Sequence, residues 1–330
     1  MSLFDDNPRN PPEENLSAHP SSDHPAESAS AERFAQPLGG DPLSHLAVTP
    51  AGSIPPPNLP EDLRISWSWP HLLVFFVFVI ASQFTIAIVV LAYFSADRRL
   101  SQKQLKHLLE SDPRLIIGTN VLWFALIFLF LYVTLAVLRD SPFWHSLGWK
   151  KFKSDPGGGR GRPWMYFLCG CGLSIFVFVA SSQVKDAEHA PIQEFFKSRT
   201  GALSLMAMAV LVAPLVEETV FRGYLYPVLA RITSAVLQFF GMEFSSATRT
   251  GVVTSILMTG TLFGLMHAPQ LGYTWGLVGL LTLVGVIFTF ARAWTGTVLA
   301  SFFLHLGYNF MIALTSIIAT KGFSHMPPGH

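Results

Sequence analysis

Residues 205–227, LMAMAVLVAPLVEETVFRGYLYP, combine an apolar stretch of membrane-spanning length with three charged side chains. About 20 apolar residues cross the hydrocarbon core of a bilayer as a helix, so this stretch predicts a transmembrane span. Glu217, Glu218 and Arg222 lie inside it. Ionisable side chains are costly at that depth, and their presence there marks a functional site. The stretch therefore predicts a membrane protein whose chemistry takes place among its helices.

The composition of the whole chain supports a polytopic membrane protein. Of 330 residues, 50% are hydrophobic and 13% are charged, whereas soluble domains carry about 25% charged residues. The formal net charge of +1 gives no electrostatic reason to expect a nucleic-acid partner. The sequence also lacks HExxH, P-loop, GxGxxG and GxSxG motifs, which excludes the common metalloprotease, nucleotide-binding and serine-hydrolase signatures.

Seven apolar stretches have lengths that suit a bilayer. They cover residues 71–94, 115–138, 164–182, 202–226, 251–267, 271–290 and 296–319. The amphipathic stretch 228–241 would either extend the fourth helix or lie along the membrane surface. We therefore expect an all-α fold, a polytopic transmembrane bundle of about seven or eight helices.

The chain divides into two regions of different composition. Residues 1–65 are rich in Pro, Ser and acidic side chains, so they predict a disordered tail, and residues 66–330 form the transmembrane domain. Within that domain, the polar patch EFSSATRT at 243–250 lengthens the connection before the fifth span. A bent or re-entrant path would then present the fifth span to its neighbours.

The orientation of the chain in the membrane follows from its basic loops. The loop 139–163 is basic and by the positive-inside rule lies in the cytoplasm, although the loop 95–114 is nearly as basic. The opposite orientation would translocate a long tail that has no signal peptide. We therefore expect a multi-pass protein of a bacterial inner membrane with its N-terminus in the cytoplasm.

The two glutamates are expected to have different roles. Residues four apart share one face of a helix, so Glu218 and Arg222 can pair, while Glu217 projects about 100° away. One carboxylate would then be held by the arginine and the other would be free to act as a general base. The spacing alone does not decide which of the two is free.

Two later spans carry further polar side chains at the same spacing of four. Phe263 precedes His267, and His305 precedes Asn309. Each group has a structural alternative, because a membrane histidine can bond a carbonyl and an asparagine can join two helices. Their occurrence on three separate spans instead favours one catalytic site, in which His moves a proton and Asn donates to an oxyanion.

These three blocks resemble a family signature. EETVFR at 217–222, FGLMH at 263–267 and HLGYN at 305–309 are similar to the EExxxR, FxxxH and HxxxN blocks of the CPBP intramembrane proteases. That family includes the type II CaaX prenyl endopeptidases and the bacteriocin-processing and self-immunity proteins. The resemblance covers residues 164–320, which would form the protease core.

The resemblance implies a role for each motif residue. Glu217 would be the general base and His267 its partner in holding a water molecule. Glu218 and Arg222 would orient the site. The tetrahedral oxygen would be received by His305 and Asn309.

Two mechanisms and three function classes follow from this resemblance. Glu217, His267 and His305 are a candidate zinc triad with the family label of a metalloprotease, but Asn309 is a poor zinc ligand. We favour a glutamate-dependent enzyme without a cofactor, and zinc is the alternative. The substrate would be a membrane-associated peptide or protein, lipidated in some family members. A non-enzymatic scaffold or immunity protein and a proton-coupled transporter are the other function classes.

Overall fold

The fold is described from a computed structural model, which covers residues 59–96, 101, 103, 104, 108, 112–152, 161–184 and 199–323. All regular elements in these residues are helical. Seven helical stretches are long and apolar enough to cross a membrane: 69–95, 114–137, 163–181, 201–239, 244–266, 275–295 and 298–319. The expected all-α, multi-pass bundle is confirmed, and the boundaries differ mostly by a few residues.

The helices before the catalytic motifs begin where local sequence favours a helix start. They are α1 (Trp69–Ser95), α3 (Pro113–Leu131), which continues as the π-helix η3 (Tyr132–Val137), the short α4 (Phe143–Ser146) and α5 (Pro163–Ser181). Each of the three long helices has a proline in its first turn, where a missing N–H donor costs nothing. Asp112 also caps α3 by accepting from the backbone of Arg114 and Leu115.

The fourth span is one long helical stretch of five parts. These are α6 (Arg199–Ala207), the π-helix η6 (Met208–Val212), α7 (Ala213–Glu218), the π-helix η7 (Thr219–Leu225) and α8 (Tyr226–Phe239). The amphipathic stretch 228–241 thus extends the fourth helix, which is one of its two predicted positions. Its buried face includes Tyr226, Val228 and Leu229.

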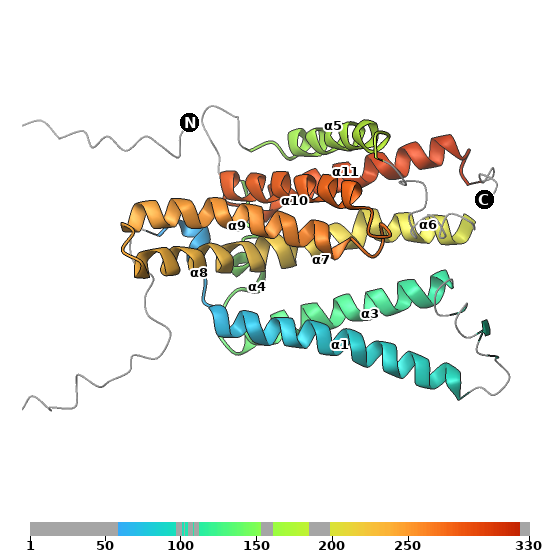
Figure 1. Cartoon of the computed structure of the whole chain (residues 1–330), viewed down its shortest axis with the longest axis horizontal. Coiled ribbons are helices and arrows are strands. Elements are labelled where there is room, and N and C mark those ends of the chain that lie inside the picture. Colours follow the sequence, from blue (N-terminus) through green and yellow to red (C-terminus); the bar gives the residue numbers. More distant parts are fainter. Residues whose placement is uncertain are drawn as a thin grey trace, which may run out of the picture. The chain divides into compact units, whose positions relative to one another are not determined.

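The last three spans are α9 (Phe244–Met266), α10 (Trp275–Thr295) and α11 (Val298–Ala319). Figure 1 shows α8, α9 and α10 side by side, with α11 next to α10 and α5 along α11. The pair α1 and α3 contacts the other helices through α6 and α8. Four helical stretches, α7/η7, α9, α10 and α11, therefore surround the motif residues.

The predicted bent path into the fifth span is wrong. Residues 244–250 already belong to α9, because Glu243 caps its first turn by accepting from the backbone of Ser245 and Ser246. Ala247 and Thr248 are buried in the same turn. The helix then runs without interruption to Met266, so His267 is presented by its C-terminal end.

The expected tail also differs at its C-terminal end. Residues 1–58 lie outside the described residues, but residues 59–65 are ordered and include the 3-10 turn η2 (Glu61–Leu63). Leu59 and Leu63 are buried against Tyr226 and Ala230 of α8. The apolar side chains of this segment thus find a partner surface that composition alone does not reveal.

Candidate active site

The two glutamates lie on a short α-helical segment between two π-helices. In η6 the N–H of Ala213 donates to Met208, and after η7 the N–H of Tyr226 donates to Phe221, each five residues back. Pro214 and Pro227 follow directly and supply no N–H, which removes an α-type hydrogen bond at both places. Such wide turns are frequent at functional sites. Two prolines inside an apolar span were the sequence signal for them.

Glu218 and Arg222 form the buried pair that the spacing predicted. Arg222 Nη1 donates to Glu218 Oε1 at 2.9 Å, and both side chains have no exposed area. The remaining guanidinium donors reach α10: Nε donates to Thr289 Oγ1 at 3.2 Å and Nη2 to the Gly285 carbonyl at 2.9 Å. Every nitrogen of this buried cation therefore has a partner, as a charge inside an apolar bundle requires.

Aromatic rings complete the surroundings of Arg222. Its Cζ lies 4.6 Å from the ring centre of Phe263, 5.3 Å from that of Phe288 and 5.6 Å from that of Phe221. A ring face attracts a cation more strongly where water is excluded. The sequence predicted Phe263 only as the first residue of a motif. In the structure its ring contacts the guanidinium of Arg222 and also packs against His267, with 4.7 Å between the two ring centres.

His305 bridges the two glutamates. Its Nδ1 lies 2.9 Å from Glu218 Oε1, and its Nε2 lies 3.9 Å from Glu217 Oε2. Because Glu218 is held as a carboxylate by Arg222, it accepts, so Nδ1 of His305 must carry the proton. The histidine is itself buried, with its ring 5.0 Å from that of Phe288. The tautomer and the ring orientation of His305 are therefore set by the buried pair of Glu218 and Arg222.

His267 faces the same oxygen of Glu217 from the end of α9. Its Nδ1 lies 2.7 Å from the Phe263 carbonyl, which only accepts, so Nδ1 donates and Nε2 points to the site. The distance from Nε2 to Glu217 Oε2 is 3.9 Å. The side chains of Glu217 and His267 are 18% and 20% exposed, whereas Glu218 has no exposure. Glu217 is thus the glutamate that remains available, which the spacing left open.

The distances around Glu217 suit a shared water molecule. An oxygen and a nitrogen 3.9 Å apart are too far for a direct hydrogen bond, and a water about 2.8 Å from each would join them. Glu217 Oε2 is buried and has no hydrogen-bond partner among the described residues. The arrangement can hold a water between a carboxylate and two imidazole nitrogens.

Asn309 stands apart from this cluster in its contacts. Its Nδ2 donates to the carbonyl of Ala209 in η6 at 2.8 Å. None of the hydrogen bonds found for the described residues joins it to Glu217, His267 or His305. The structure thus brings five of the six predicted site residues together and gives Asn309 a contact that joins α11 to η6. Its predicted role at an oxyanion stays a prediction.

The candidate zinc triad was compared with the geometry of zinc ligands. Ligands at about 2.1 Å from a tetrahedral zinc ion lie about 3.4 Å from one another, and both imidazole nitrogens are 3.9 Å from Glu217 Oε2. Among the residues that the structure describes, no three His, Cys, Asp or Glu side chains are arranged to hold a metal ion. As placed, Glu217, His267 and His305 do not fit zinc.

Sequence reasoning missed the close approach of α9 and α10 that supports the site. A Cβ on Gly285 would lie 2.8 Å from the Gly260 carbonyl and 3.0 Å from Phe263 Cβ. Only glycine allows the two backbones to come this close, and it brings the Gly285 carbonyl to Arg222. Gly260 and Gly264 form a GxxxG pattern in the span, which was the available signal.

One family model matches the part of the chain that carries this site. Residues 199–311 match the family model described as type II CAAX prenyl endopeptidase Rce1-like. No curated protein and no solved structure matches the chain. The matched residues begin with α6 and end in α11, so they include all three motif blocks. Over residues 199–311 the chain is therefore similar to the type II CAAX prenyl endopeptidase Rce1-like family, as the resemblance of the three motifs predicted.

Proposed function

We propose that the protein is an intramembrane endopeptidase that hydrolyses a peptide bond of a membrane-associated substrate, with Glu217 as general base. The observation that supports this most directly is the difference between the two glutamates. Glu218 is bonded to Arg222 and His305, whereas Oε2 of Glu217 faces two imidazole nitrogens at equal distance. A carboxylate in that position can take a proton from a water molecule held beside it.

The reaction would proceed by direct attack of this water. Glu217 and His267 orient the water, and Glu217 takes its proton as the oxygen attacks the carbonyl carbon of the scissile bond. The negative charge passes to the carbonyl oxygen of the tetrahedral intermediate. Glu217 then returns the proton to the amide nitrogen as the C–N bond breaks, which releases an amine and a carboxylic acid. The mechanism requires no metal and no cofactor.

The position of His305 supports it as the donor to the tetrahedral oxygen. Its Nδ1–H binds Glu218, which fixes the ring, and its Nε2 faces Glu217 at 3.9 Å. A proton on Nε2 during the reaction would be donated to the oxyanion. Asn309 would donate a second hydrogen bond through the N–H that Ala209 does not use.

The substrate class follows from the family and the membrane setting. A prenylated C-terminal peptide fits a CAAX-type endopeptidase, because its lipid partitions into the bilayer that surrounds the helices. We place the protein in a bacterial inner membrane with its N-terminus in the cytoplasm, since the basic loop 139–163 favours that side.

The test uses the full chain purified in detergent and pairs of quenched fluorescent peptides, farnesylated and unmodified. Glu217→Gln should lower cleavage by about 10²–10⁴-fold at an unchanged melting temperature, since it removes only the general base. Glu243→Gln, the same change at an exposed helix cap, serves as the control and should retain activity. Cleavage by Glu217→Gln at the rate of the wild type would refute the assignment.

Two further arms separate the alternatives. Activity that disappears with a zinc chelator and returns with zinc would replace the metal-free mechanism by a zinc-dependent one. A folded wild-type protein that cleaves neither peptide would favour the scaffold or the transporter.

A further inference from the structure

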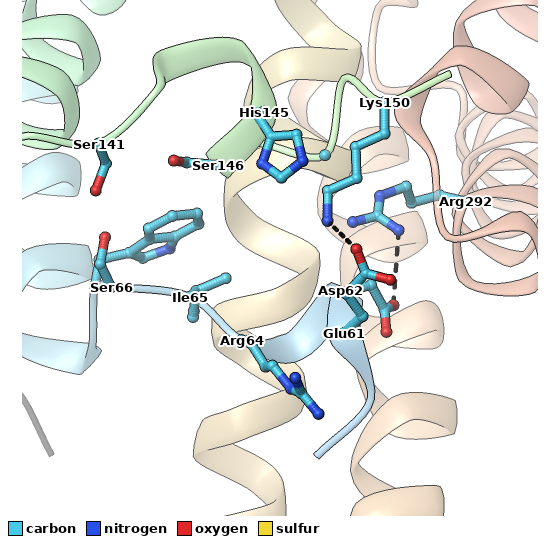
Figure 2. Close-up of a pocket in the computed structure, with 12 residues that line it drawn as sticks. Glu61, Asp62, Arg64, Ile65, Ser66, Ser141, His145, Ser146, Lys150 and Arg292 are labelled. Atoms are coloured by element: carbon cyan, nitrogen blue, oxygen red, sulfur yellow. Dashed lines mark hydrogen bonds and ion pairs between the residues drawn. The ribbon is translucent and has the colours of Figure 1, made fainter. Parts of the chain in front are cut away.

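A second polar site lies at one end of the bundle, away from the motif residues. Figure 2 shows a cavity between the segment before α1, the loop that contains α4, and Arg292 of α10. Its volume is about 270 Å³, which suits a small headgroup better than a peptide chain. It is lined by residues 61, 62, 64–67, 141, 145, 146, 148, 150 and 292, and by none of the six motif residues.

Arg292 is the feature of this cavity that needs a ligand. The residue is 2% exposed, yet its Nε and Nη1 have no hydrogen-bond partner among the described residues. Nη1 lies 3.6 Å from Asp62 Oδ2, beyond hydrogen-bonding distance, and that oxygen already accepts from Tyr226 at 3.2 Å. Buried donors are nearly always satisfied, so two unsatisfied donors on one guanidinium that lines a cavity indicate a missing acceptor.

The loop opposite Arg292 is shaped to leave room for the guanidinium. Gly148 has φ +81°, and a Cβ there would lie 2.6 Å from Arg292 Nη2. The Gly148 carbonyl accepts from the backbone of Val298, which fixes this loop to the start of α11. The guanidinium of Arg292 therefore lies against the backbone of Gly148, where a side chain would leave it no room.

The charges around the cavity favour an anion. Three basic side chains, Arg64, Lys150 and Arg292, line it with two acidic ones, Glu61 and Asp62. Lys150 Nζ binds Glu61 Oε1 at 2.8 Å, and Asp62 Oδ2 lies 3.6 Å from Arg292 Nη1 and accepts from Tyr226. The lining side chains therefore carry three formal positive charges against two negative ones.

Hydroxyl groups complete the lining. Ser141 and Ser146 donate to backbone carbonyls, and Ser66 lies across the cavity from them (Figure 2). Guanidinium groups bind phosphate oxygens in proteins through several parallel N–H donors, and Arg292 has two nitrogens without a hydrogen-bond partner among the described residues.

The cavity also lies at the ends of helices that are long and apolar enough to cross a membrane, where bilayer phosphates are expected. Its residues precede α1, follow η3 and include Arg292 in the last turn of α10, and Gly148 accepts from the first residue of α11, so four membrane spans begin or end beside it. Basic pockets between transmembrane helices at this level bind lipid headgroups.

We propose that this cavity binds a phosphate group, from a phospholipid headgroup or from free phosphate, with Arg292 as its principal ligand. The site is independent of the proposed peptidase reaction, and its occupancy would stabilise the junction of the segment 61–67 with α10 and the loop before α5.

The test measures the melting temperature of the delipidated full-length protein in a neutral detergent at constant ionic strength. The probes are sodium phosphate, dihexanoyl phosphatidylglycerol, dihexanoylglycerol without phosphate, and choline chloride. A phosphate ligand tenfold above its dissociation constant should raise the wild-type melting temperature by about 3 °C. A shift with sodium phosphate supports free phosphate as a ligand, and a shift with the phosphatidylglycerol alone supports the headgroup.

Four variants make the result specific. Arg292→Met and Arg292→Lys should abolish or reduce the shift, since both lose the planar set of donors. Ser66→Trp fills the cavity from an exposed position at its rim and leaves Arg292 intact, and it should also abolish the shift. This variant shows whether a lost shift reflects a blocked cavity or only a folding defect of the arginine variants. Arg114→Met, at the exposed opposite end of the second span, should keep the full shift. Three outcomes would overturn the proposal. The first is an equal shift in wild type and Ser66→Trp, and the second is the absence of a shift with either phosphate compound. The third is a shift with choline chloride or dihexanoylglycerol.

Discussion

Two arginines are buried among the residues that the structure describes, and their surroundings differ. Arg222 has a partner for each nitrogen and three aromatic rings around its guanidinium. Arg292 is almost as deeply buried, but its Nε and Nη1 have no hydrogen-bond partner in the described part of the chain, and the ion pair of Nη1 with Asp62 is 3.6 Å long. Burial alone therefore does not distinguish an arginine that holds a site together from one that is available to a ligand. The count of satisfied donors does.

This difference has a physical cause. A buried cation is stable only if its lost hydration is replaced, and Arg222 replaces it entirely with groups of α7, α9 and α10. Arg292 lines a cavity, so a ligand or solvent can supply what the protein does not. We therefore expect substitution of Arg222 to cost more stability than substitution of Arg292.

The largest expected effect separates the two arginines directly. Arg222→Met leaves Glu218 buried without its cation and should lower the free energy of unfolding by about 3–5 kcal/mol. Arg292→Met should cost about 1 kcal/mol, because Asp62 keeps its bond from Tyr226 and some exposure. Chemical unfolding in a mild detergent, followed by tryptophan fluorescence, measures both. Equal losses in the two variants would show that the comparison is wrong.

The second effect concerns the backbone that supports Arg222. Gly285→Ala places a Cβ 2.8 Å from the Gly260 carbonyl and should cost about 1–3 kcal/mol through overpacking. Peptidase activity should fall with it, because the Gly285 carbonyl accepts from Arg222. Gly279→Ala is the control on the same helix, since no atom lies within 4 Å of a Cβ there. If both alanines leave stability and activity unchanged, the close approach of α9 and α10 does not support the site.

A smaller effect is expected beside Arg292. Gly148→Ala and Gly241→Ala both put alanine at a positive φ, which costs about 1–2 kcal/mol, but only the first also meets a side chain. The excess loss at position 148 should be below about 1 kcal/mol, because the end of Arg292 is free to shift. Thermal unfolding of both variants gives this difference, and an excess as large as that of Gly285→Ala would mean that Arg292 is held as firmly as Arg222.

The smallest expected effect concerns Glu243, an exposed carboxylate that contrasts with the two buried arginines. Hydrogen bonds from the side chain and backbone of Ser245 and from the backbone of Ser246 lower the pKa of Glu243 to about 2. A carboxyl group whose pKa is depressed on folding stabilises the folded state at any pH above its pKa in the unfolded chain, which is near 4.5. This contribution is lost as the pH falls towards 2, the pKa in the folded state.

The difference in melting temperature between wild type and Glu243→Ala should therefore be constant above about pH 5 and shrink below it. Added salt should reduce it as well, since the group is exposed. A difference that does not change between pH 6 and pH 3 would show that the cap acts through packing and not through charge.

Part of the fold and of the candidate site could be predicted from the sequence, because these features depend on local geometry. Apolar length gave the seven spans, and a spacing of four gave the pair of Glu218 and Arg222, because both depend on local helix geometry. The three motif blocks named six candidate site residues, five of which lie together in the structure. The sequence could not show which glutamate is free. That depends on the hydrogen bond between His305 and Glu218 and on the exposure of Glu217, and both are set by tertiary packing.

Other features needed the packed structure. Leu59 and Leu63 are ordered only because α8 offers Tyr226 and Ala230, whereas composition predicted a tail through residue 65. The bond from Asn309 to Ala209 depends on a carbonyl exposed by a π-helix, and no periodicity in α11 anticipates it. The cavity at Arg292 joins segments separated by more than 200 residues, so no local pattern could indicate it.

The two π-helices of the fourth span have a consequence for how the sequence tolerates deletion. Each contains one residue more than regular α-helical pairing would need, so removing one residue from 219–225 would let the chain close into ordinary turns. The register of α7 relative to α8 would then change by the rotation of one residue, about 100°. An in-frame loss of one codon would leave a protein that still inserts and keeps its spans, and in which Glu218 can still pair with Arg222 three or four residues later, but the present alignment of Glu217 with the buried face of α8 would be lost.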